Sequence, residues 1–84
     1  MSKTQKLLDR LLAEPPPTDF TWTQAVSLMK RHNFEVINGN GSRRTFRHTT
    51  GLKVHIHEPH PNPTLLKYAI TALIDGLKGT GEIE

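Results

Sequence analysis

The chain has 84 residues, with 11 Lys/Arg, 8 Asp/Glu, no cysteine and a formal net charge of +3. A chain of this length forms one domain that buries only about 60% of its unfolded surface, so marginal stability is expected and a deep, enclosed active site is not. The lack of cysteine excludes disulfides and thiolate metal sites. Its apolar runs are too short to span a bilayer and its first residues open an amphipathic segment, which together predict a cytoplasmic protein without a membrane partner.

The first predicted element is a short amphipathic helix over residues 4–13, because four leucines recur at helical spacing: Leu7, Leu8, Leu11 and Leu12. Three prolines at 15–17 end it and form a stiff spacer. We therefore divide the chain into an N-terminal helix with a proline-rich linker, 1–19, and a domain, 20–84. Unless it packs against another apolar surface, the leucine stripe would form an exposed apolar patch. We expect it to dock on the last helix of the same chain or on a neighbouring subunit in a homodimer.

A second helix is predicted to begin after Thr21, which forms a capping box with Gln24, with Phe20 in the position of a hydrophobic staple. Asn33 can adopt the left-handed conformation that ends such a helix. The apolar stripe of this helix consists of Trp22, Ala25, Val26 and Met29. On this stripe, Trp22 is expected in the core rather than as a platform for base stacking.

Three strands follow, over residues 34–38, 43–48 and 52–57, separated by turn sequences at 38–41 and 49–51. Their alternation indicates one apolar face, made of Phe34, Val36, Phe46, Val54 and Ile56. Phe46 sets the register, since facing it outward would expose the only large apolar side chain of its strand.

Residues 58–63 contain three prolines and predict a rigid connector. Asn62 is then expected to cap the last helix with Pro63 in its first position, and Gly79 to end it, leaving a frayed tail over 80–84. The apolar face of this helix is predicted to be Leu66, Ala69, Ile70, Leu73 and Leu77. The result is an α+β fold of order α-β-β-β-α with both helices on one sheet face, plus the extra N-terminal helix.

The other face of the sheet collects cations and imidazoles. Six Lys/Arg stand against Glu35 alone between Lys30 and His57, which is typical of a surface that meets phosphate, although a solvated strand face gives the same pattern. His55 and His57 lie on one strand face, about 6 to 7 Å apart, and could serve as general base and acid in metal-free RNA cleavage, with Arg43 stabilising the charge. The predicted RNA-binding residues are Ser42, Arg43, Arg44, Arg47, Lys53 and His60.

The segment Gly41-Ser42-Arg43-Arg44-Thr45-Phe46-Arg47-His48, followed by Val54-His55-Ile56 and the corner Pro59-His60-Pro61, resembles the HicA family. This resemblance implies a toxin of a type II toxin–antitoxin pair with a fold like the double-stranded-RNA-binding domain. It further implies an mRNA endoribonuclease that inhibits translation, needs no metal or other cofactor, and is neutralised by a HicB antitoxin. In the family the residue after Gly-Ser is usually a catalytic histidine, and here it is Arg43. Since arginine cannot act as a base at neutral pH, either another histidine has taken that role or the chain binds RNA without cutting it.

Other interpretations of the histidines remain open. His55, His57 and His60 could hold a catalytic zinc ion. A non-catalytic RNA-binding or partner-binding module with the same fold would use the same cations. His48 is expected to be a turn residue, and His32 to make a favourable contact at a helix C-terminus.

Overall fold

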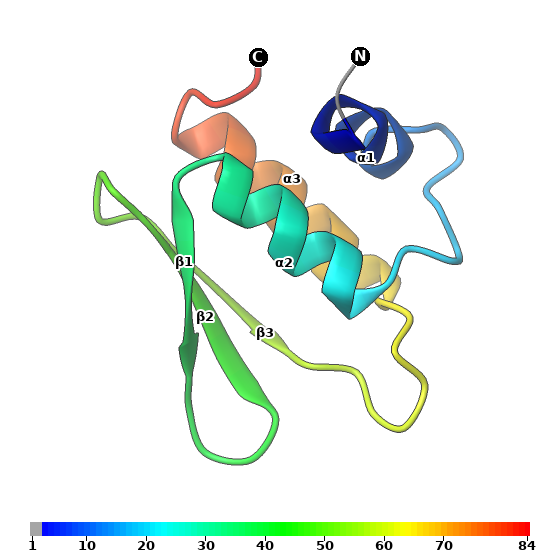
Figure 1. Ribbon diagram of the computed structural model, residues 1–84, viewed down its shortest axis with the longest axis vertical. Coiled ribbons are helices and arrows are strands. Elements are labelled where there is room, and N and C mark those ends of the chain that lie inside the picture. The colour runs from blue at the N-terminus through cyan, green and yellow to red at the C-terminus, as the bar shows by residue number, and fades with distance from the viewer. Residues whose placement is uncertain (1–2) are drawn as a thin grey trace.

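The computed structural model describes residues 3–84, so Met1 and Ser2 of the predicted segment 1–19 lie outside the described residues. Helices α2 and α3 lie on one face of a three-stranded antiparallel sheet, and α1 lies beside α2 (Figure 1). The predicted α+β fold is therefore confirmed, with the element order of the double-stranded-RNA-binding domain after α1. The elements are α1 Lys3–Leu11, α2 Trp22–Arg31, β1 Phe34–Asn38, β2 Arg43–His48, β3 Lys53–His57 and α3 Lys67–Gly79.

The sheet has the order β1-β2-β3, and its register places Val36, Phe46 and Val54 opposite one another. Phe46 is fully buried and its ring centroid lies 5.4 Å from that of Trp22 on α2. The predicted orientation of the sheet is confirmed, and Trp22 packs against the core. Because side chains alternate along a strand, burial of Phe46 turns its odd-numbered neighbours on β2 toward solvent.

Helix α2 begins with the predicted capping box. The hydroxyl of Thr21 accepts from the Gln24 amide at 3.3 Å, and the Gln24 side chain accepts from the Thr21 amide at 3.0 Å. Asn33 has a φ of 68°, the left-handed conformation that lets the chain leave the helix and enter β1.

Helix α1 docks within the chain. Leu8 and Leu11 are buried in the same core as α2 and α3, and Leu12 is left 38% exposed. The Arg10 guanidinium lies over the ring of Phe20, the residue that follows the linker, at 5.5 Å from the ring centroid. The prediction was docking on the last helix of the same chain or on a neighbouring subunit, whereas the helix that α1 packs against is α2.

The start of α3 was predicted wrongly. Its N-cap is Leu66 rather than Asn62, because residues 63–65 are extended and pair with residues 20–22. The Trp22 amide donates to the Pro63 carbonyl and the Leu65 amide to the Phe20 carbonyl, both at 2.8 Å. Asn62 instead accepts from the Thr64 amide in a local turn. As a result Leu65 enters the core while Leu66, predicted on the apolar face, is 66% exposed.

Residues 80–84 are not frayed. The Ile83 amide donates to the Leu77 carbonyl and the Ile83 side chain packs against the core. The Glu82 carboxylate accepts from His48 Nε2 at 2.8 Å and from Asn33 Nδ2 at 3.1 Å, and lies 3.2 Å from His32 Nδ1. His48, expected to be a turn residue, points inward from the end of β2 and is only 5% exposed.

Candidate nucleic-acid interface

The solvent-facing side of the sheet consists of short cross-strand rows. Arg43 lies opposite His57 and Thr45 opposite His55, and in a third row Arg47 lies between Glu35 and Lys53. The register thus brings the predicted catalytic residues His55, His57 and Arg43 together, with Lys53 and Arg47 at the far end of the same face. Directly opposite residues on one face have Cβ atoms about 5 Å apart, so each row can act on one ligand group.

A hydroxyl group from β2 or its preceding turn holds each imidazole. Thr45 Oγ1 lies 3.0 Å from His55 Nδ1, and Ser42 Oγ lies 3.2 Å from His57 Nδ1. Among residues 3–84, neither Nε2 atom has a hydrogen-bond partner. Engaging Nδ1 fixes the ring orientation and leaves Nε2 as the atom that can give or take a substrate proton.

These rings border a hollow of about 540 Å³. The hollow lies at the end of the sheet where β1 turns into β2. Besides the two histidines it is lined by Gly39, Asn40, Arg43, Arg44, Thr45 and Ile56. We call it the sheet-face hollow.

The four predicted phosphate-binding cations of β2 and β3 differ in what else they contact. Arg47 forms an ion pair with Glu35 at 2.8 Å on the exposed face. Arg44 is on the opposite face, where it donates to Glu58 at 2.9 Å and to two backbone carbonyls. Arg43 and Lys53 have no side-chain partner within the described part of the chain. The cations available to an incoming phosphate are therefore Arg43, beside the imidazoles, and Lys53.

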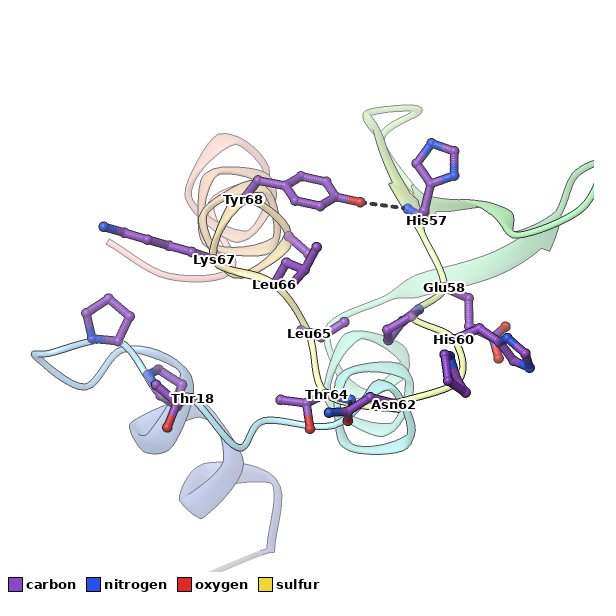
Figure 2. A pocket seen from close by; sticks show the side chains of 15 residues that line it. Thr18, His57, Glu58, His60, Asn62, Thr64, Leu65, Leu66, Lys67 and Tyr68 are labelled. Carbon is purple, nitrogen blue, oxygen red and sulfur yellow. Dashed lines mark hydrogen bonds between the residues drawn. The ribbon is translucent and has the colours of Figure 1, made fainter.

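The three imidazoles of the zinc interpretation do not converge. His60 lies in the proline corner beyond β3, away from the exposed sheet face (Figure 2). Within residues 3–84, no group of three or more His, Cys, Asp or Glu side chains is arranged to hold a metal ion.

Two residues near the imidazoles were not assigned a role from the sequence. Thr45 was placed on the exposed face only as part of the alternation, and it orients His55. Tyr68, on the first turn of α3, reaches across to β3, where its hydroxyl oxygen accepts from the His57 amide at 3.2 Å (Figure 2). The sequence did contain a signal for Tyr68, because it is an aromatic residue that falls outside the apolar stripe of its helix.

Comparison with protein families matches residues 22–81 to the family described as the HicA toxin of bacterial toxin–antitoxin systems. The chain belongs to the HicA toxin family. Comparisons with curated proteins and with solved structures gave no match. Membership of a toxin–antitoxin family implies an antitoxin as partner. The matched span runs from the start of α2 to just beyond α3, so α1 and the proline linker lie outside the part shared with other HicA toxins. No helix in the described part of the chain is long and apolar enough to cross a membrane.

Proposed function

We propose that this HicA toxin is a metal-independent endoribonuclease that cleaves mRNA in the cytoplasm and is neutralised by a HicB-type antitoxin. The observation that carries the proposal is the pair of imidazoles on one sheet face, each with Nδ1 held by a hydroxyl group, beside an arginine that has no side-chain partner among residues 3–84. Acid–base catalysis needs two proton-transfer groups on either side of the reacting phosphate, and two imidazoles on one sheet face are suited to these roles.

The proposed reaction is an internal displacement at phosphorus. One of His55 and His57 takes the proton from the ribose 2′-hydroxyl, whose oxygen then forms a bond to phosphorus as the bond to the 5′-oxygen breaks. The other imidazole donates a proton to the departing 5′-oxygen. The products are a 2′,3′-cyclic phosphate and a 5′-hydroxyl, and no water or metal ion is consumed in this step.

Arg43 has an electrostatic role in this proposal. It stands opposite His57, and its guanidinium can stabilise the negative charge that develops on the phosphate oxygens. It replaces the histidine usual at this position in the family, and the two imidazoles of β3 then carry both proton transfers.

Single-turnover cleavage of an end-labelled RNA in EDTA tests the proposal. We expect a 2′,3′-cyclic phosphate on the 5′ fragment, and a loss of about 10²- to 10⁴-fold in rate for each of His55→Ala and His57→Ala. Lys30→Ala removes an exposed cation from the end of α2 and should keep the wild-type rate. Full cleavage by both histidine variants would refute the assignment.

The second function that the site supports is RNA or partner binding without cleavage, and Arg43 itself is the observation that favours it. Arg43→His separates the two functions, because it restores an imidazole to the position that is usually catalytic in the family. If the natural chain leaves RNA intact and only Arg43→His cleaves it, the natural chain is a binding module.

The toxin role has its own test. Induced expression of the chain alone should stop growth with loss of intact mRNA, and co-expression of an antitoxin should restore both. Unchanged growth and RNA at confirmed expression of the folded protein would count against it.

A further inference from the structure

A second concave surface adjoins the proposed catalytic face. It has a volume of about 700 Å³ and lies between the start of α3, the connector after β3 and the proline linker after α1 (Figure 2). His57 borders both this groove and the sheet-face hollow. The two surfaces therefore adjoin at His57, so that neighbouring units of one polymer could contact both.

The groove presents apolar and aromatic surface to water. Leu66 is 66% exposed and Tyr68 is 49% exposed, and Pro59 and Pro61 also line the groove. The Tyr68 hydroxyl is tied to the His57 amide, which fixes the ring against the strand that carries the proposed catalytic imidazoles (Figure 2). A ring held in this way provides a preformed stacking surface, because little side-chain freedom is lost when a flat ligand covers it.

The charge of the groove suits a polyanion. Glu58 is the only acidic residue among those that line it, and its carboxylate is paired with Arg44 at 2.9 Å. Lys67 and His60 also line it. No free carboxylate on its walls would therefore repel a nucleotide.

We propose that this groove is a nucleobase subsite, in which an unpaired base next to the scissile phosphate stacks on Tyr68. The inference rests on the proposed function for its substrate, and it adds that the substrate is single-stranded or has a base turned out of its helix. Bases in a duplex are stacked on one another and cannot enter a groove. Although the fold is like that of a double-stranded-RNA-binding domain, this subsite would therefore select an unpaired base and not a continuous duplex.

The sole tyrosine of the chain permits a direct measurement. Incorporation of 3-fluorotyrosine places one ¹⁹F nucleus at position 68. The probe is a 2′-O-methyl oligoribonucleotide of about eight residues, which binds like RNA but lacks the nucleophilic hydroxyl. We expect the ¹⁹F resonance to move as the single strand is added and to stay in place with the blunt duplex of the same sequence.

Variants at the same position supply the affinity test. Tyr68→Ala should weaken binding of the single strand by about five- to 150-fold, the range for losing one stacked base. Tyr68→Phe keeps the ring and loses only the hydrogen bond to His57, so it should bind within about threefold of wild type. Thermal unfolding of both variants verifies that each is folded.

The outcomes separate this inference from the proposed function. Salt-dependent RNA binding with an unmoved ¹⁹F resonance and unchanged affinity in Tyr68→Ala would overturn the base subsite and leave the nuclease proposal standing. A resonance that moves only with a proline-rich or aromatic peptide would also overturn it, assigning the groove to a protein partner. No RNA binding or cleavage by the folded wild-type chain would overturn the proposed function, and the subsite with it.

Discussion

The Glu82 carboxylate connects the last residues of the chain to the C-terminal ends of α2 and β2. Its removal should lower the free energy of unfolding. His48 Nδ1 accepts from the Thr50 amide at 3.1 Å, so its proton is on Nε2, which donates to Glu82 at 2.8 Å. Hydrogen bonds from His48 first, then Asn33, lower the pKa of Glu82 from its usual 4.5 to about 2. The perturbation we consider is Glu82→Gln, which keeps the shape and removes the charge.

The size of the effect follows from the pKa. A lowering from 4.5 to about 2 corresponds to about 3 kcal/mol of unfolding free energy at neutral pH, at about 1.4 kcal/mol for each factor of ten in proton affinity. The side chain is 19% exposed, and solvent screening reduces the expected loss to about 2 kcal/mol. For a domain of this length such a loss lowers Tm by about 10 °C.

Thermal unfolding followed by circular dichroism measures this loss across pH. A carboxylate with a lowered folded-state pKa stabilises the protein fully above the unfolded-state pKa, and this contribution disappears as the pH falls from about 4.5 toward 2. We therefore expect Glu82→Gln to be less stable than wild type at pH 7, with the two converging near pH 2. Glu84→Gln, which removes the same charge from an exposed neighbour, should match wild type throughout. Equal stability of Glu82→Gln and wild type at pH 7 would refute the reasoning.

Three further predictions concern packing and charge. Leu11→Ala should lower the free energy of unfolding by about 2–5 kcal/mol because Leu11 is fully buried, whereas Leu12→Ala should lower it by less than about 1 kcal/mol. Denaturant unfolding measures both, and equal losses would mean that α1 is not docked in solution. Gly76→Ala would bring a Cβ atom to 2.5 Å from Val54 Cγ2, so a loss of about 1–2 kcal/mol is expected in the same assay despite the better helix propensity of alanine. Arg43→Ala should reduce by about one the slope of log affinity for RNA against log salt in a native-gel titration, and an unchanged slope would show that Arg43 contacts no phosphate.

The sequence predicts those parts of the fold that depend on neighbouring residues. Alternation around Phe46 and the capping box at Thr21 are local patterns, and both are present in the structure. The start of α3 was predicted wrongly because the local helix-start signal at Asn62-Pro63 competes with strand pairing to residues 20–22, which are more than 40 positions away. The predicted fraying of residues 80–84 was wrong for the same reason, since no local sequence pattern relates the Glu82 carboxylate to the His48 imidazole.

For the candidate site, the sequence predicts which side chains share a face but not which cations are already paired. Arg47 forms an ion pair because Glu35 lies opposite it, and the register of β1 on β2 determines that position. Arg44 lies on the other face of the same strand, where Glu58 reaches it from beyond β3. Composition alone counts all of these cations equally, whereas the structure leaves Arg43 and Lys53 unpaired within residues 3–84.

The core and the proposed catalytic face depend on the same register. A slip of one residue between β2 and β3 would carry His55 and His57 to the core side and would turn Val54 and Ile56 to water. Burial of Val54 and Ile56 opposes that slip, since both side chains are enclosed in the core. The hydroxyl groups that orient the imidazoles come from β2 and its turn, while the imidazoles come from β3, so each hydrogen bond between them requires the register that the core selects. The apolar packing that stabilises the domain thus also positions the two imidazoles to which we assign proton transfer, and core substitutions that loosen this packing should lower the proposed cleavage rate as well as stability.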